Sequence, residues 1–154
     1  MFHITEQKID TQAWHDKLHG HALGGVVTFE GRIRNQNSGR TVLALEYDIF
    51  PELAEKEGLL VLKEASAKFP IEQAYAIHRY GKLALGEVAV FVGVGAVHRD
   101  EAFTACRFII DEIKSRVPIW KREFYDTGKN AWVGCPACEK KGSHASLHLA
   151  NCLK

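Results

Sequence analysis

Positively charged and titratable residues gather between His98 and Glu123, and they carry the clearest chemical signal in the chain. The pair His98-Arg99 precedes a helical pattern, Lys114 lies near the end of that pattern, and the run Lys121-Arg122-Glu123 follows it. Cationic groups held beside apolar residues attract anions, and a partly dry pocket tunes their basicity. The pattern therefore predicts chemistry on an anionic substrate.

Lys114 is the first candidate for catalysis, because it lies at the edge of an apolar helical stripe beside Ile110 and Arg107. An edge position lets the aliphatic stem pack on apolar surface while the amine reaches a cleft. A neighbouring arginine and partial burial would make the amine a better base or nucleophile. Position alone favours the alternative, a surface lysine that extends its amine into solvent.

Lys121 and Glu123 share one face of an extended segment, and Arg122 lies on the opposite face. Pro118 sets the backbone direction of this segment and Trp120 is large enough to anchor it. The lysine and the carboxylate could form an acid–base pair or an exposed ion pair. Their spacing alone favours the ion pair.

Two further groups of cationic residues could bind an anion. His98-Arg99 stands where a strand ends and a helix begins, a place where free backbone N–H groups point, and His78-Arg79 repeats the strand-end pattern. Arg32 and Arg34 alternate on one strand face, so two guanidiniums could hold a phosphate bidentately. The alternatives are a structural histidine, an arginine that caps local carbonyls, and the polar outer face of a hairpin.

The composition indicates one ordinary globular domain. The chain has 154 residues, of which 46% are hydrophobic and 25% charged, and its net charge is +1. A net charge near zero excludes a global field that would attract nucleic acid or an anionic membrane. No apolar run approaches the ~20 residues that span a bilayer, and the first residues lack the pattern of a secretory signal. We therefore expect a cytoplasmic protein.

Hydrophobic periodicity predicts the elements that must position these side chains. The strand over residues 87–97 is apolar on both faces, so it should lie centrally in a sheet. We expect the strands 25–34 and 41–49 to form a hairpin around the polar loop 35–39. This order of elements predicts an α+β fold with a largely antiparallel or mixed sheet flanked by helices. The other expected elements are a helix over 10–20, a helix from Pro51 to Pro70, a strand over 71–79, a helix from an Asp100 N-cap to Pro118, and extended segments over 119–125 and 131–134.

Several segments together resemble the large, catalytic subunit of molybdopterin synthase, in consistent order over about residues 20–134. A likeness of that length is more specific than any single short motif. The resemblance implies an α/β hammerhead fold, which agrees with the α+β prediction. The matching stretches are Gly24–Asn35, Leu45–Tyr47, Ile77–Gly81, Val97–Arg99, Ile113-Lys114 and Pro118–Glu123.

The resemblance also implies an activity and partners. In this family, sulfur passes from the C-terminal thiocarboxylate of a small ubiquitin-like subunit to cyclic pyranopterin monophosphate, and two transfers build the dithiolene of molybdopterin. Two large subunits form a central homodimer within a heterotetramer, and the Gly-Gly tail of each small subunit enters a pocket of the large one. We expect no cofactor to be required for catalysis.

The functional residues of the family match residues that their charge and position had already identified in this sequence. Lys114 matches a lysine regarded as essential beside the incoming thiocarboxylate, and Lys121 matches a second functional lysine. Fixed ammonium groups would stabilise the negative charge that develops there, so Lys114 is expected to act electrostatically and in proton transfer, and Lys121 in proton transfer at the pterin. The resemblance places in the substrate site Arg32, Ile33, Arg34, His98, Arg99, Lys114, Lys121, Arg122 and Glu123.

The C-terminal residues depart from the family pattern, so the chain divides into a catalytic-subunit-like domain over 1–134 and a tail over 135–154. The tail holds a C-x-x-C pair followed by histidines and a last cysteine, a set that could bind a structural zinc ion. An ordinary flexible tail with incidental cysteines is the alternative. The preferred ligands are Cys135, Cys138, His148 and Cys152, with His144 as the substitute.

Two other functions stay open on the residues alone. A lysine-dependent lyase or aldolase on a phosphorylated carbonyl compound would use Lys114 as a Schiff-base amine. A non-enzymatic module would bind zinc through the tail and RNA through the basic strand ends. The neutral net charge and the lack of aromatic residues interleaved with basic ones count against nucleic-acid binding.

Overall fold

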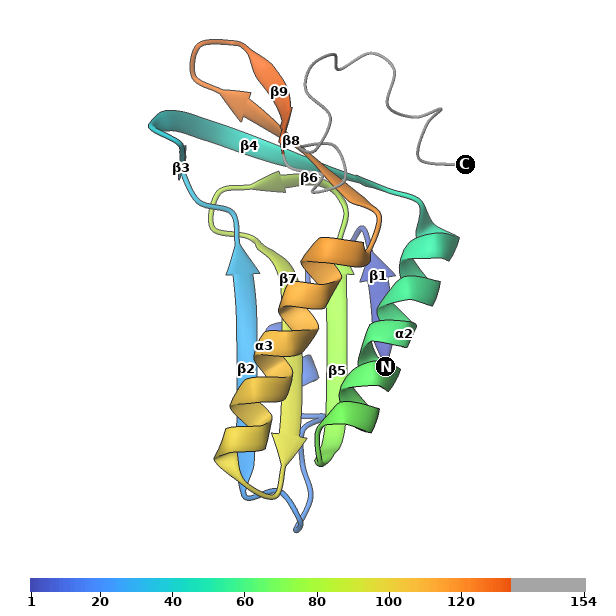
Figure 1. The fold of residues 1–154 in the computed structure, drawn as a ribbon. Coiled ribbons are helices and arrows are strands. Elements are labelled where there is room, and N and C mark those ends of the chain that lie inside the picture. The colour runs from blue at the N-terminus through green and yellow to red at the C-terminus, as the bar shows by residue number, and fades with distance from the viewer. Residues whose placement is uncertain (134–154) are drawn as a thin grey trace.

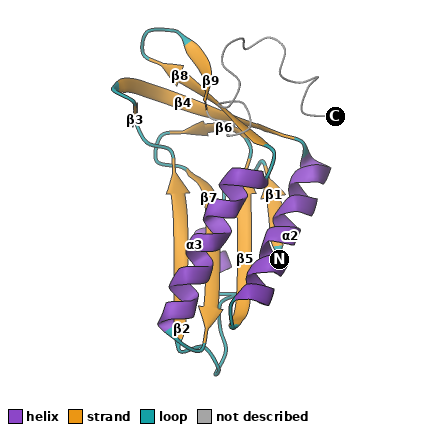
Figure 2. Ribbon diagram, viewed as in Figure 1, coloured by secondary structure: helices purple, strands orange, loops and turns teal. Residues whose placement is uncertain are grey.

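A computed structural model of the chain describes residues 1–133, which form three helices and two β-sheets (Figures 1 and 2). The predicted zinc ligands Cys135, Cys138, His148 and Cys152 lie outside the described residues. The mixture of helices with two largely antiparallel sheets confirms the α+β prediction.

The first sheet has four strands, and both long helices pack on one of its faces (Figure 1). β1 runs parallel to β5, whereas β5 and β2 are antiparallel to β7. The sequence prediction lacked β1, a strand of four residues that is too short to show a clear period. In sheet order the strands are β1 (Phe2–Thr5), β5 (Ile71–Arg79), β7 (Val88–Ala96) and β2 (Gly25–Arg32), and the two helices are α2 (Pro51–Lys68) and α3 (Arg99–Arg116).

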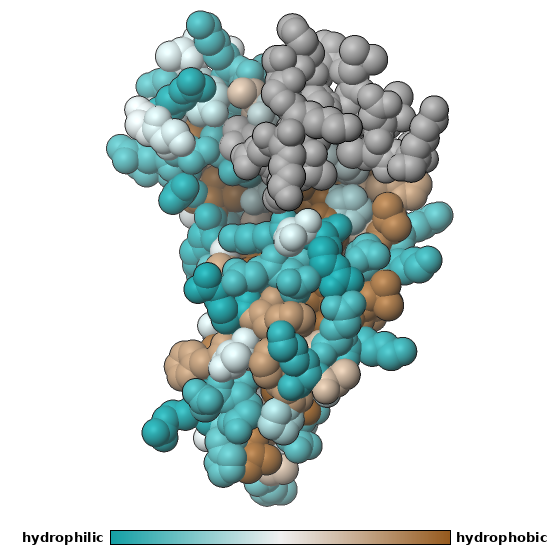
Figure 3. Space-filling model, viewed as in Figure 1, coloured by the Kyte–Doolittle hydropathy of each residue, from teal (hydrophilic) through white to brown (hydrophobic). Residues whose placement is uncertain are grey.

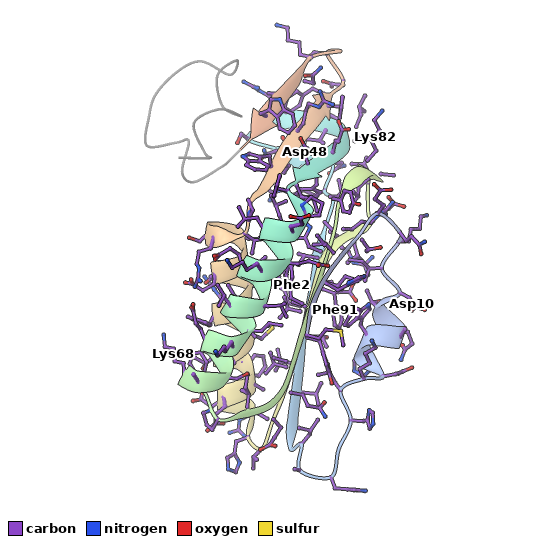
Figure 4. All side chains as sticks on the ribbon, turned by 90° about the vertical axis from the view of Figure 1, so that its right-hand side faces the viewer. Phe2, Asp10, Asp48, Lys68, Lys82 and Phe91 are labelled. Carbon is purple, nitrogen blue, oxygen red and sulfur yellow. The ribbon has the colours of Figure 1, made fainter. Side chains whose placement is uncertain are left out.

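β7 lies inside the first sheet and is covered on both faces, as its apolar sequence predicted. Val92 and Val94 belong to the core under the helices. Phe91 points to the opposite face, where α1 (Thr11–His15) and the chain that follows it pack (Figure 4). Phe2 lies on the helix side of the sheet and packs against α2 at Gly58 (Figure 4).

The second sheet lies across one end of the first (Figure 1). Its strand order is β3 (Gln36–Asn37), β4 (Arg40–Ile49), β8 (Ile119–Tyr125) and β9 (Asn130–Val133), and β6 (Gly81–Ala84) pairs with the same β4. A small apolar cluster of Ile33, Leu45, Leu83 and Ala89 lies at the junction of the two sheets. The chain passes between the sheets several times, so residues distant in sequence meet there.

The predicted hairpin of residues 25–34 with 41–49 is wrong. β2 pairs with β7 in the first sheet, whereas β4 pairs with β6 and β8 in the second. The ladder of β2 becomes irregular at Gly31/Arg32, and Ile33 then buries its side chain in the junction cluster. The hairpin is confined to β3 and β4, which join through Ser38 and Gly39 at φ of 49° and 76°.

α3 carries the predicted apolar stripe, but it begins two residues earlier than expected. His98 is the N-cap and Asp100 lies in the first turn, where a carboxylate favours the positive end of the helix dipole. The predicted helix over 10–20 shortens to α1, which Asp10 caps by accepting a hydrogen bond from the Ala13 amide. The buried stripe residues are Ala102, Cys106, Ile109, Ile110, Ile113 and Val117.

Gly24 makes a close backbone contact that positions the start of α3. A Cβ at this position would overlap the Val97 carbonyl oxygen, a backbone atom that no side-chain rotation can move. We expect Gly24→Ala to lower the free energy of unfolding by about 1–3 kcal/mol in a urea titration. Gly25→Ala is the graded comparison: its Cβ would lie 3.0 Å from the Arg99 Cα, a tight contact without overlap, so it should lose less stability than Gly24→Ala. Equal losses in the two variants would contradict the overlap as the cause.

Candidate functional site

A cavity of about 610 Å³ opens at the junction of the two sheets. Its walls come from the end of β2 and the chain after it, from β4, from the last turn of α3 and from β8. The segments that carry the predicted site residues therefore converge on one hollow. Predicted residues on its lining are Arg32, Ile33, Arg34, Lys114, Lys121 and Glu123.

Lys114 stands in the last turn of α3, at the mouth of this cavity. The residue is exposed, so solvent reaches it, and its Nζ lies 5.8 Å from the ring centroid of Phe29. The negative end of the α3 dipole and the face of the Phe29 ring both favour a cation at this place. A positive charge is thus held where β2, α3 and the cavity meet.

Lys121 forms the ion pair that its spacing predicted, but the pair lies inside the cavity and not on an exposed face. Its Nζ lies 2.9 Å from Glu123 Oε1, and the Glu123 side chain is 3% exposed. Burial raises the pKa of Glu123, but hydrogen bonds from Asn37, Lys121 and Tyr125 outweigh it and hold the pKa below its ordinary value. Glu123 is therefore an ionised, buried partner of Lys121.

Arg32, Ile33 and Arg34 reach the cavity in three different ways. Ile33 is buried in the junction cluster and forms part of the apolar floor. Arg32 donates to the Glu30 carboxylate, with Nη2 2.5 Å from Oε2, so its charge is already paired. Arg34 is exposed and donates from Nη2 to Asn37 Oδ1 over 3.3 Å. Of this trio, Arg34 offers the guanidinium that a substrate anion can pair with.

His98 and Arg99 do not line this cavity within the single chain. They lie at the N-terminal end of α3, and Lys114 lies at its C-terminal end. A helix rises 1.5 Å per residue, so about 22 Å separates Arg99 from Lys114 along the axis. The structure therefore brings the two lysines and Arg34 together but leaves His98 and Arg99 at the far end of the molecule.

Arg122 faces away from the cavity, on the outer side of the second sheet. Its guanidinium binds the Glu46 carboxylate and lies 5.2 Å from the ring centroids of Phe124 and Trp132. Strand alternation produces this arrangement, because Lys121 and Glu123 already occupy the inner face. The contacts of Arg122 are those of a residue that braces the sheet.

Five polar residues on the lining were not predicted as site residues: Glu30, Gln36, Asn37, Tyr47 and His78. His78 is buried, and burial lowers its pKa to about 4, so the imidazole is neutral near pH 7. Its Nδ1 lies 2.8 Å from the Arg79 carbonyl oxygen, which makes Nδ1 the donor and leaves Nε2 as an acceptor. The strand-end pattern had drawn attention to His78, but as an anion site.

Tyr47 packs its ring edge-on to His78, with centroids 5.0 Å apart. Burial, helped by the charge of Glu123, raises the pKa of Tyr47 to about 12, so the phenol stays protonated. Arg79 is occupied by structural contacts, with Nη1 2.9 Å from Glu87 Oε2. Tyr47 belongs to a stretch that resembles the family, but no residue pattern assigned it to the site, and no motif marks Asn37.

A second cavity of about 380 Å³ adjoins the first, between β2 and α3. Phe29 and Lys114 border both cavities. This cavity includes Phe103, whose side chain is 62% exposed, and it runs along β2, which is an edge strand among the described residues. Figure 3 shows hydrophobic residues exposed among hydrophilic ones on the face where α3 lies in Figure 1.

Residues 1–133 contain no cluster of three or more His, Cys, Asp or Glu side chains placed to hold a metal ion. None of the helices described here is long and apolar enough to cross a membrane.

Comparisons with known proteins identify the family to which this chain is similar. The family model described as "MoaE protein" matches residues 4–116. A molybdopterin synthase catalytic subunit from Thermoplasma volcanium is 41% identical over 129 residues, which cover 84% of this chain and 94% of the relative. One from Pyrococcus abyssi is 48% identical over 112 residues, 73% of this chain and 75% of the relative. The crystal structure of molybdopterin synthase from Staphylococcus aureus matches with a TM-score of 0.81 and 31% identity, over 86% of this chain and 96% of that one.

Proposed function

The chain belongs to the MoaE family, and from that premise we propose that it is the catalytic subunit of a molybdopterin synthase. It transfers sulfur from the thiocarboxylated C-terminus of a small ubiquitin-like subunit to cyclic pyranopterin monophosphate. The observation that carries this proposal is the convergence of Lys114, Lys121 and Arg34 on one cavity between the sheets. Both reactants are anions, and this cavity concentrates cations on a chain whose net charge is only +1.

We assign to Lys114 the stabilisation of charge on the reacting thiocarboxylate. When a nucleophile attacks the thiocarboxylate carbon or sulfur leaves it, negative charge develops on oxygen or sulfur. A preorganised ammonium beside an apolar ring stabilises that charge more than water does, because it needs no reorganisation. Lys114 meets this description through its place at the end of α3 and its distance of 5.8 Å from the Phe29 ring.

Lys121 and Glu123 form a coupled acid–base pair on the opposite wall of the cavity. The ionised carboxylate 2.9 Å away holds the Lys121 amine in position. The ammonium can donate a proton to the pterin, and the resulting neutral amine regains a proton from solvent. Arg34, whose side chain is exposed at the rim, is placed to bind the phosphate of the pterin. Substrate phosphate and transferred sulfur would thus meet between two fixed positive centres.

We propose that His98 and Arg99 complete the site from a second copy of the chain. Within one protomer about 22 Å of helix separates Arg99 from Lys114, so a shared site requires an antiparallel partner. The edge strand β2 and the neighbouring apolar cavity beside α3 offer such an interface. A two-fold axis at the middle of β2 would bring the start of the partner's α3 beside Lys114, in an isologous contact.

Reconstitution tests the proposed function. Purified chain, thiocarboxylated small subunit and cyclic pyranopterin monophosphate should together form the dithiolene, and omission of any one of them should abolish product. Treatment with borohydride in the presence of the pterin should give no covalent adduct at Lys114. A trapped adduct without sulfur transfer would instead indicate a Schiff-base lyase.

We propose separately that the tail binds one structural zinc ion through Cys135, Cys138, His148 and Cys152. Support comes from the C-x-x-C spacing, which suits a zinc site, and from a later histidine and cysteine whose spacing in the sequence is less regular. A cytoplasmic location, which we also propose, would keep these thiols reduced and available for a metal.

Metal analysis of protein purified without a polyhistidine tag is expected to find about one zinc per chain. Cys135→Ser with Cys138→Ser should remove the zinc. Cys106→Ala is the matched control, because Cys106 is a buried thiol in α3 and should not contribute a ligand. Zinc far below one per chain in the unaltered protein would refute the site.

A further inference from the structure

Asn37 occupies an unusual place between the two charged groups of the cavity wall. We propose that Asn37 is a positioning residue, a neutral spacer that keeps the charge of Arg34 free for the substrate anion and reserves Glu123 for Lys121. The inference rests on the proposed function, because it assigns Arg34 to the phosphate of the substrate. It concerns a residue that neither charge nor motif singles out.

The Asn37 amide meets a different group with each of its two ends. Nδ2 donates to both carboxylate oxygens of Glu123, each over 2.9 Å. Oδ1 accepts from Nη2 of Arg34 over 3.3 Å. This orientation of the amide follows from its neighbours, since a carboxylate only accepts hydrogen bonds and a guanidinium only donates them.

Glu123 has no free acceptor site left for Arg34. Oε1 accepts from Asn37 and lies 2.9 Å from Lys121 Nζ, and Oε2 accepts from Asn37 and from the Tyr125 hydroxyl over 3.0 Å. An ionised carboxylate offers about four lone-pair positions, and these contacts occupy them. With its side chain only 3% exposed, Glu123 has little access to water that could substitute for a lost donor.

Arg34 is bound weakly by comparison. Its contact with Asn37 is long, at 3.3 Å, and it uses one of the five N–H donors of the guanidinium. An amide oxygen carries only a partial charge, so Arg34 keeps its full positive charge toward the cavity. If Arg34 paired directly with the Glu123 carboxylate, that charge would be neutralised and Lys121 would lose part of its counter-ion.

The backbone holds the spacer in this position. Asn37 is the last residue of β3, and its Cα pairs with that of Arg40 across the tight turn of Ser38 and Gly39. Both turn residues have positive φ, which suits the short connection of a hairpin. The short β3–β4 hairpin therefore presents the amide to a carboxylate that lies 86 residues later in the chain.

Asn37→Leu, which has a similar volume but neither donor nor acceptor, tests the inference. We expect the KM for cyclic pyranopterin monophosphate to rise about tenfold, because Arg34 turns toward Glu123. The acidic limb of the pH profile should stay in place, because the Arg34 guanidinium replaces the two hydrogen bonds that the charged form of Glu123 loses. Asn37→Asp should raise the KM further, since its carboxylate pairs with Arg34 and repels Glu123.

A double variant and a matched control separate this role from a structural one. Arg34→Ala with Asn37→Leu should have the KM of Arg34→Ala alone, because both changes act on one charge. Ser38→Gly, at a φ of 49° that glycine adopts freely, should leave KM and pH profile unchanged. A loss of kcat and melting temperature in Asn37→Leu with unchanged KM would overturn the inference.

An NMR titration of the Glu123 carboxyl group measures the effect of Asn37 on the pKa of this group and needs no catalytic turnover. In the double variant of Arg34→Ala with Asn37→Leu its pKa should rise, because no donor replaces the Asn37 amide, whereas in Asn37→Leu alone Arg34 should keep the pKa low. Ser38→Gly should leave the pKa in place. An unchanged pKa in the double variant, or a rise in Asn37→Leu alone, would refute the inference even if the enzyme transfers sulfur. The expected pattern together with inactive unaltered protein would instead refute the proposed function and leave the spacer supported.

Discussion

Lys114→Ala is expected to lower the rate of dithiolene formation by about 10²–10³-fold while the small subunit still binds. The change removes the ammonium that stabilises charge on the reacting thiocarboxylate, and no other cation stands in the last turn of α3 on the same side of the cavity. The rate is measured in single turnover with preformed thiocarboxylate, so that binding and chemistry are separated. Partner affinity is measured independently by titration calorimetry.

Lys68→Ala is the matched control for this prediction. Lys68 also stands in the last turn of an 18-residue helix and places its amine over a phenylalanine ring, 4.7 Å from the centroid of Phe108 (Figure 4). It borders neither cavity, so its removal should leave the transfer rate unchanged. Near-normal transfer by Lys114→Ala with the partner bound would contradict the role assigned to Lys114.

Mixed dimers of Lys114→Ala and Arg99→Ala are expected to regain activity that neither variant has alone. If each site combines Lys114 of one chain with Arg99 of the other, a heterodimer contains one intact site and one doubly altered site. Random mixing makes half of the dimers heterodimers, so about a quarter of the sites should recover. The physical reason is the length of α3, which keeps the two residues of one chain about 22 Å apart.

The activity of such a mixture is measured after the two variants are unfolded together and refolded, so that subunits exchange. The control is a mixture of Lys114→Ala with Lys121→Ala, which line the cavity of a single chain and should not complement each other. Zero recovery in the first mixture, with heterodimers verified by mass spectrometry, would show that Arg99 does not act from a second copy.

The candidate residues were visible in the sequence because cations next to apolar periodic segments are a local signal. Lys114 at the edge of the α3 stripe, the Lys121–Glu123 spacing and the apolar β7 could all be interpreted from the periods of helix and strand. The resemblance to a family then connected these segments to one activity, which the family match bears out.

Other features required the tertiary structure, because they depend on which strands pair. The period of two that identifies β2 and β4 as strands is the same whether they pair with each other or lie in different sheets. Burial of Ile33 in the junction cluster decides between the two arrangements.

The same limit applies to the side chains of the site. Alternation along β8 places Arg122 opposite Lys121, but only the packing of the second sheet decides which of these two faces borders the cavity. Asn37 carries no charge and belongs to no motif, and its role arises from a contact with Glu123 across 86 residues of chain. Sequence periodicity reports local geometry, whereas the pairing of distant segments depends on the free energy of the whole fold.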